Sequence, residues 1–252
     1  MLKKISNISS TLIINLYEGF YLSSLKDTSV IQEKISKIYN SNNLISIARE
    51  ISKTIKTEIL HESSHNFKPF GDSGSMLIQA DLSLYNSATL HLEESHITFH
   101  TYIEDILKKY LIVRVEFHIS SCSDANVFYS LNNIFQNSKN CNALSPHLAT
   151  VDYLRRGAKF GDHSGDIMYD TFDISDIKFK NLYHILSNNS FINSLNTKNY
   201  ILLLNMQDMV KNLQIENPFL SMKSIHQFRN FLLESYANEH DKSDLLDLEF
   251  IK

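Results

Sequence analysis

The chain has 252 residues, of which 43% are hydrophobic and 11% aromatic, and this is enough apolar material for a large core. Its 24 basic and 28 acidic residues give a formal charge of -4 without a long block of one sign, which argues against nucleic acid as a partner. No segment reaches the roughly 18 consecutive apolar residues that a membrane helix needs, and the first residues lack a signal-peptide pattern. We therefore expect a soluble, cytoplasmic protein without a membrane partner.

Cysteine, glycine and proline are scarce in this chain. The two cysteines, Cys122 and Cys141, form neither a disulfide framework nor a zinc-binding spacing, which agrees with a reducing compartment. With 6 glycines and 3 prolines the chain has no flexible linker between independent domains, and it has no internal repeat. We predict one main domain, residues 1–180, followed by an extension, residues 181–252.

Apolar spacing predicts the elements in chain order. Residues 9–22 read as a first strand, and one or two helices follow with a break near residues 40–42. Alternating residues then predict strands, and a helix between the last two of them, at 75–80, 96–104, 111–120, 127–137 (the helix) and 147–154. Residues after 180 are less regular and mainly helical, in NLYHILSNNSFINSL, QDMVKNLQ and HQFRNFLLESYANE. The predicted fold class is α+β: a two-layer α/β sandwich with an antiparallel sheet packed on helices, plus a mainly helical C-terminal extension.

One loop collects the residues with unusual backbone preferences. The stretch Phe67-Lys68-Pro69-Phe70-Gly71-Asp72-Ser73-Gly74 holds one of the three prolines and two of the six glycines. Glycine reaches backbone angles that other residues avoid, so a tight and specifically shaped loop is expected here. An ordinary turn before a strand would show the same composition, and the pattern alone does not separate the two interpretations.

Two neighbouring strands carry unusual polar faces. In LEESHITFHTYIE the even positions share one side of the strand, and the next strand repeats the arrangement with Arg114, Glu116, His118, Ser120 and Cys122. The short connection between the strands predicts a hairpin, which places both polar faces on the same side of one sheet. Any sheet with one wet face shows such alternation, so a structural role stays open beside a catalytic one.

The string His61-Glu62-Ser63-Ser64-His65 matches the zinc-protease motif H-E-x-x-H. That motif binds zinc only on a helix, where the two histidines share a face. Serines weaken helix formation here and Pro69 ends any helix soon after, while 11 histidines in the chain make a chance match plausible. We predict no metal site at this string.

The motifs together resemble the pyruvoyl-dependent S-adenosylmethionine decarboxylases of bacteria and archaea. The resemblance covers roughly residues 12 to 157 and is carried by the order and spacing of three motifs: Phe-x-Pro-x-Gly-x-Ser-Gly at residues 67–74, Glu-Ser-His-x-x-x-His-Thr-aromatic-x-Glu at residues 94–104, and a strand ending in Ser121-Cys122. Tyr17-Glu18 and the segment DYLRRG at residues 152–157 resemble the longer bacterial branch of the family.

The resemblance implies that the chain cuts itself between Glu94 and Ser95, into fragments 1–94 and 95–252. Ser95 is similar to the serine that attacks its own preceding carbonyl and becomes a pyruvoyl group, the cofactor that binds the substrate amine and accepts the electrons released with carbon dioxide. His100 matches the residue that handles protons in this processing step, and Ser73 matches a serine that assists it.

The same resemblance implies a nucleoside site. Cys122 aligns with the thiol that protonates the product carbon, and Phe67 and Tyr102 align with aromatic residues that stack on adenine. Glu104 aligns with the carboxylate that accepts hydrogen bonds from the ribose. The small-molecule substrate expected from these residues is S-adenosylmethionine, and its product would supply spermidine synthesis.

Two positions depart from the family pattern, because Ile103 stands where proline is common and Ser123 where glycine is usual after the cysteine. Relatives in the family decarboxylate arginine or ornithine, and a homologue that is not processed could be a regulatory subunit, so these alternatives stay open. Family members form dimers or larger assemblies, which implies self-association of the cleaved chains. The longer branch can require Mg2+, but no cluster of residues in the sequence places a metal.

Overall fold

A computed structural model describes ten parts of the chain, and all statements below refer to them: residues 9–22, 28–68, 71–80, 94–107, 110–121, 127–135, 144–156, 174, 177–187 and 197–236. Within these parts no helix is long and apolar enough to cross a membrane.

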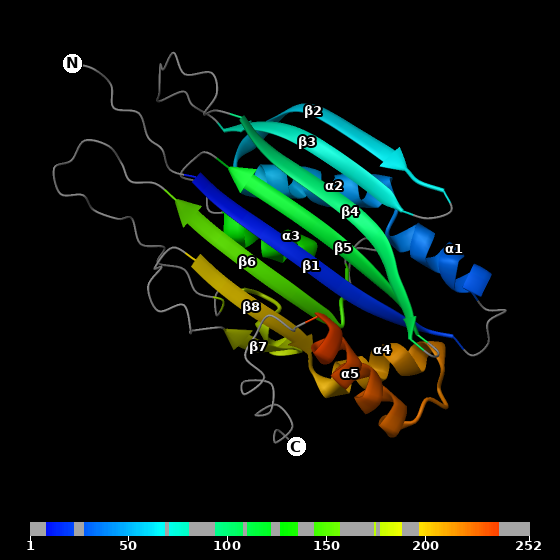
Figure 1. Cartoon of the computed structure of the whole chain (residues 1–252). Coiled ribbons are helices and arrows are strands. Elements are labelled where there is room, and N and C mark those ends of the chain that lie inside the picture. The colour runs from blue at the N-terminus through cyan, green and yellow to red at the C-terminus, as the bar shows by residue number, and fades with distance from the viewer. Residues whose placement is uncertain are drawn as a thin grey trace, which may run out of the picture.

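The centre of the molecule is an eight-stranded sheet in the order β2-β3-β4-β5-β1-β6-β8-β7 (Figure 1). Every neighbouring pair runs antiparallel. The strands are β1 (Ser9–Tyr21), β2 (Thr57–Asn66), β3 (Asp72–Ala80), β4 (Glu94–Leu107), β5 (Tyr110–Ser121), β6 (Leu148–Arg156), β7 (Tyr183–Ser187) and β8 (Thr197–Leu204).

Helices cover the two faces of the sheet unequally. Figure 1 looks onto what we call the front face, with the second and third α-helices behind the sheet, the first at its right-hand side and the last two at one end of the front. The α-helices are α1 (Thr28–Ile38), α2 (Ser41–Thr54), α3 (Leu131–Ile134), α4 (Met206–Glu216) and α5 (Met222–Tyr236), and two short 3-10 helices are η2 (Val127–Ser130) and η4 (Lys180–Leu182). The fold is therefore α+β, as the sequence predicts.

The core lies between the sheet and the helices behind it. Even positions of β1 point to this back face, where Leu12 and Ile14 are fully buried and Leu16 is 2% exposed. Their partners in β5 are Ile119, Phe117 and Val115, which are also buried. Strand alternation then turns the odd positions of β1 and the even positions of β4 and β5 to the front face.

The helical part of the chain after residue 180 differs from the prediction. Helices α4 and α5 confirm the two later segments, but residues 183–187 and 197–204 are strands that extend the sheet beyond β6. Residues 200–204 are buried without interruption, so β8 shows no alternation between its two faces. A short run that is apolar on both sides cannot be told from a buried helix by periodicity, which explains the error.

The string His61-Glu62-Ser63-Ser64-His65 lies in β2, a strand that the sequence did not predict. In a strand the first and last residues of this string are about 13 Å apart. Within the described residues, no group of three or more His, Cys, Asp or Glu side chains is placed to hold a metal ion.

Candidate functional site

The glycine-containing loop is the tight turn between β2 and β3. The Phe67 backbone N–H donates to the Gly71 carbonyl at 2.7 Å, and Gly71 has a φ of +119°, a conformation that strongly favours glycine. The Asp72 carboxylate accepts a hydrogen bond from the Ser41 backbone N–H at 3.1 Å, at the first turn of α2. The turn is thus fixed to the helix layer, and the Phe67 side chain projects from it with 56% of its surface exposed.

Gly74 allows β3 to lie directly against a core ring. A Cβ at this position would meet Phe99 Cζ at 2.3 Å, and Phe99 is only 1% exposed. Gly74 is paired with Phe99 in the sheet, so the next pair, Ser73 and His100, points to the opposite face. The glycine that shapes the packing on the back face therefore also sets the position of Ser73 on the front.

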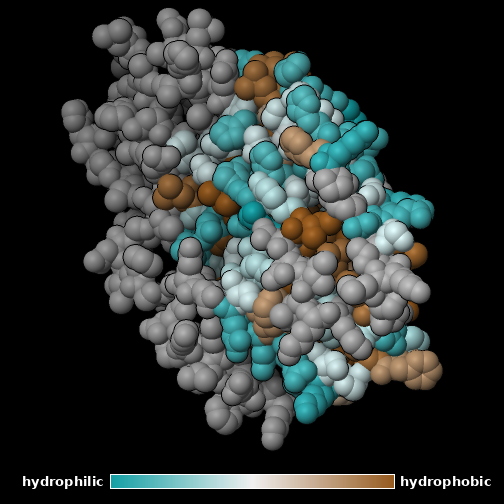
Figure 2. Space-filling model, turned by 45° about the vertical axis from the view of Figure 1, so that its right-hand side comes forward, coloured by the Kyte–Doolittle hydropathy of each residue, from teal (hydrophilic) through white to brown (hydrophobic). Residues whose placement is uncertain are grey.

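A row of polar residues crosses the front face of the sheet. Ser73 in β3 is opposite His100 in β4, which is opposite Glu116 in β5, which is opposite Asn15 in β1. We call these four residues the polar row. Tyr102 lies two residues beyond His100 on the same face, with ring centroids 6.1 Å apart, and is 39% exposed. Figure 2, turned toward the side of the molecule, shows mainly hydrophilic described atoms with small hydrophobic patches between them.

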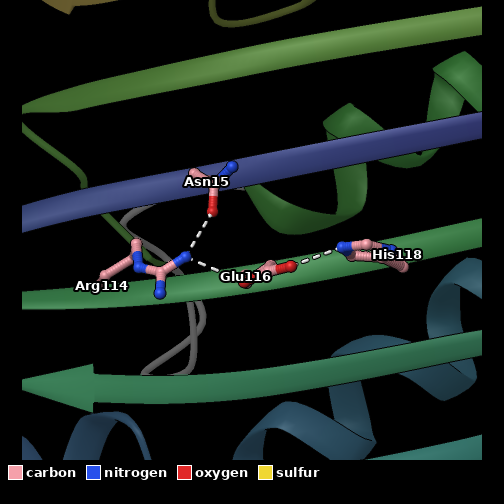
Figure 3. Close-up of polar contacts among 4 residues, drawn as sticks. All are labelled: Asn15, Arg114, Glu116 and His118. Atoms are coloured by element: carbon pink, nitrogen blue, oxygen red, sulfur yellow. Dashed lines mark hydrogen bonds and ion pairs between the residues drawn. The ribbon is translucent and has the colours of Figure 1, made fainter. Parts of the chain in front are cut away.

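Arg114 and His118 extend this row along β5 (Figure 3). The Arg114 guanidinium donates to Glu116 Oε2 at 2.9 Å and to Asn15 Oδ1 at 3.1 Å. His118 Nε2 donates to the other oxygen of Glu116. Arg114 also lies over the Tyr102 ring, with Cζ 4.2 Å from the ring centroid. A connected set of polar and aromatic side chains thus joins β1, β4 and β5 on the front face.

Ser95 lies at the other end of β4 and on the other face. Its side chain is 2% exposed and it pairs with Ile78 of the core. Two more serines, Ser10 and Ser121, are buried at this end of the sheet, where they pair with each other. Sequence reasoning did not find Ser10, because nothing in the pattern of β1 indicates that its first residues lie across from the end of β5.

Three predicted site residues are described only in part or not at all. Cys122 lies outside the described residues, directly after Ser121 at the end of β5. Glu94 and Glu104 belong to β4, but their side chains are outside the described part, and β4 has an irregular register between Ile103 and Asp105. Because His96 pairs with Ser120, the strand that leads into Cys122 ends beside the start of β4.

The predicted residues therefore form two groups on β4. Ser95 and the end of β5 make one group, and the other contains Phe67, Ser73, His100 and Tyr102 toward the opposite end of the strand. Strand rise separates the Cα of Ser95 from that of His100 by about 17 Å and from that of Tyr102 by about 24 Å. The side chains of Ser95 and His100 also point to opposite faces, so the structure does not bring these two residues together.

Burial changes the protonation of the imidazole next to Ser95. His96 faces the front, and partial burial lowers its pKa, with a smaller contribution from the nearby His118. A lowered pKa favours the neutral ring, which can accept a hydrogen bond at one nitrogen.

The comparisons with known proteins show what the chain is similar to. No protein-family model matches it. Over 90% of its length it is 24% identical to the S-adenosylmethionine decarboxylase proenzyme of Brevibacillus brevis, and the match covers 94% of that protein. The chain is thus similar, over most of its length, to S-adenosylmethionine decarboxylase proenzymes. Proteins of the same name match from Clostridium botulinum, at 25% identity over 60% of this chain and 61% of that protein, and from Hahella chejuensis, at 27% over 69% and 68%.

A solved adenosylmethionine decarboxylase from Aquifex aeolicus is 13% identical to this chain and covers 65% of it with a TM-score of 0.35, while the whole of that solved chain is matched. The fold of this chain is assigned from its own strand order and register.

Proposed function

We propose that this chain is a self-processing, pyruvoyl-dependent decarboxylase of S-adenosylmethionine, working in the cytoplasm and supplying spermidine synthesis. The observation that carries the proposal is the match to a decarboxylase proenzyme along nearly the whole of both chains. The word proenzyme implies an inactive precursor that becomes active by processing. Glu94-Ser95, in the family's motif, is the bond at which we place the cut.

Processing would use the Ser95 hydroxyl as a nucleophile on the Glu94 carbonyl carbon. As the ester forms, the peptide bond between Glu94 and Ser95 breaks, and elimination then releases the Glu94 carboxylate. Addition of water and loss of the serine nitrogen as ammonia leave a ketone at position 95. A pyruvoyl group supplies a carbonyl that takes up the substrate amine and the electrons released with carbon dioxide.

The position of Ser95 fits such a group in two respects. The residue is 2% exposed, so a ketone formed there would be kept from bulk water. It also begins a strand that is held on both sides, since β4 pairs with β3 and β5 along its length. A cut before Ser95 therefore leaves the new chain end in place. Because position 95 is then no longer bonded to Glu94, the direction of its terminal group is no longer set by the alternation of the strand.

The other residues would bind the substrate and move protons. Phe67 and Tyr102 present exposed aromatic rings suited to stacking on a nucleoside base, and Glu104 would accept hydrogen bonds from the ribose. Cys122 would protonate the product carbon, since a thiol with a pKa of about 8.5 is still mostly protonated at neutral pH. His100 and Ser73, paired across β3 and β4, would assist processing.

We also propose that two copies of the chain complete each active site. The separation of about 24 Å between Ser95 and Tyr102 along β4 exceeds the length of one nucleoside substrate. We propose that the front face of one copy contacts the other copy. This contact would place Ser73, His100 and Tyr102 of the first copy near Ser95 and Cys122 of the second. Self-association is thus part of the proposed mechanism.

Intact-mass measurement of the purified protein tests the proposed processing. Wild type should give two fragments, residues 1–94 and 95–252, and the Ser95→Ala chain should stay whole because it lacks the nucleophile. Ser75→Ala is the matched control, since Ser75 is an exposed serine of the neighbouring strand and its loss should leave the cut unchanged. A wild-type chain that remains a single species would overturn the proposal.

A further inference from the structure

Arg114 lies against the exposed ring of Tyr102 in the proposed substrate site. Tyr102 and Arg114 are paired directly across β4 and β5, and the guanidinium carbon lies 4.2 Å from the centre of the ring. This geometry is a cation–π contact, in which the positive group is attracted by the negative face of the ring. One face of Tyr102 is therefore covered by Arg114.

Two neighbouring side chains on the front face hold the Arg114 guanidinium in position. Glu116 and Asn15 accept its hydrogen bonds at 2.9 and 3.1 Å, and Glu116 is itself held by His118. The Arg114 and Glu116 side chains are only 23% and 21% exposed, so the pair is less screened by water than a surface ion pair. The Arg114 guanidinium is thus held by two acceptors, and Figure 3 shows it pointing toward Glu116 and Asn15.

A fixed cation on one face of a ring changes what the ring can bind on its other face. A second cation on the far side would be repelled by the guanidinium and would meet a π-system that is already polarised. A neutral planar base suffers neither penalty, because it binds by stacking and by burial of apolar surface. The 39% of Tyr102 that remains exposed is therefore better suited to a neutral ring than to a guanidinium or ammonium tail.

We propose that Arg114 is a positioning residue that makes the Tyr102 site select a neutral planar base over a cationic side chain. The proposal rests on the proposed function and deepens it, because it gives the residue that would distinguish a nucleoside substrate from a basic amino acid. His100, whose ring lies 6.1 Å from that of Tyr102 at an interplanar angle of 27°, borders the same site.

Binding calorimetry on the full chain tests this inference with adenosine and arginine as the probes. In Arg114→Met, adenosine should bind about threefold to tenfold more weakly and arginine no more weakly than before, so that the preference for adenosine falls. Arg114→Lys keeps the charge but loses the planar fork, and it should restore the preference only in part. Arg49→Met removes a guanidinium of α2 from an exposed pair with Glu62 of β2, and it should leave both affinities unchanged.

Glu116→Gln keeps the guanidinium but weakens the ion pair that holds it, so it should reduce the preference for adenosine over arginine by a smaller factor. This variant also tests the inference if Arg114→Met does not fold. For the decarboxylation reaction, Arg114→Met should raise KM for S-adenosylmethionine more than it lowers kcat. Unchanged preference in both variants, or a wild type that binds arginine more tightly than adenosine, would overturn the inference. Chain cleavage is scored separately by mass, so a chain that stays whole yet shows the Arg114 effect contradicts the proposed function and leaves the inference standing.

Discussion

Among the described carboxyl groups, Glu18 has the largest change of pKa on burial. It lies in β1 on the back face, opposite the buried Val113, and accepts a hydrogen bond from the Tyr39 hydroxyl. Burial raises the pKa of Glu18 to about 8, against a smaller opposite effect of the Lys34 ammonium. At neutral pH this carboxyl is therefore mostly protonated in the folded chain and ionised in the unfolded chain.

The raised pKa predicts how stability depends on pH. The contribution of Glu18 is fully present below its unfolded pKa of about 4.5 and is lost as pH rises toward 8, because over that range only the unfolded chain has released the proton. Glu18→Gln should remove this loss. The free energy of unfolding of the variant, relative to that of wild type, should therefore rise by roughly 2–4 kcal/mol between pH 4.5 and pH 8. Urea unfolding across this range measures it, and Glu33→Gln on the surface of α1 is the control, whose profile should follow wild type.

Gly74 predicts a second effect at the scale of one residue. Its replacement by alanine would place a methyl group 2.3 Å from Phe99 Cζ, in a part of the core that cannot yield easily. We expect Gly74→Ala to lower the free energy of unfolding by about 1–3 kcal/mol. Ser75→Ala, one residue along and exposed, should change it little, and equal effects of the two substitutions would contradict this account of the packing between Gly74 and Phe99.

At the scale of elements, β4 and β5 were predictable because each has one apolar and one polar face. Their alternation gave the hairpin and the shared side of Tyr102 and Arg114, both of which the register confirms. Strand β8 was not predictable, since residues 200–204 are buried on both sides. The separation of Ser95 from His100 could also be predicted, because it follows from strand rise and alternation. The motif was interpreted by its residue types, and the faces of the strand on which they lie were not compared.

The docking of α5 on the front face is another feature that local patterns do not contain. Phe228 of α5 is fully buried, stacks on Tyr110 at 4.3 Å and occupies the space above Gly19 of β1. A Cβ on Gly19 would lie 2.1 Å from Phe228 Cζ, so only the absence of a side chain in β1 lets the helix approach. Helix and strand depend on each other although they are far apart in the sequence.

Gly19→Ala should therefore displace α5 while the rest of the sheet stays intact. Hydrogen exchange should become faster for the backbone amides of residues 222–236 and remain slow in β4 and β5. Adding Phe228→Leu, which shortens the opposing side chain, should recover part of the protection in α5. Uniformly faster exchange across the molecule, or no change in α5, would show that this contact does not hold the helix.

At the scale of the whole molecule, the proposal that two copies share each site predicts complementation. Ser95→Ala lacks the group that becomes the cofactor, and Tyr102→Ala lacks the ring that stacks on the substrate, so each should be nearly inactive alone. Co-expression of the two variants should restore up to about a quarter of wild-type activity, because about half of randomly paired dimers are mixed and each mixed dimer contains one intact site of two. Activity no greater than the sum of the separate variants would show that each copy works by itself.

The central claim is that this chain decarboxylates S-adenosylmethionine, and release of labelled carbon dioxide tests it most directly. Purified wild type, incubated in parallel with carboxyl-labelled S-adenosylmethionine, arginine and ornithine, should release label from S-adenosylmethionine alone, and Ser95→Ala should release none. Release from arginine or ornithine but not from S-adenosylmethionine would contradict the proposed substrate, and no release from any of the three would contradict the proposed activity.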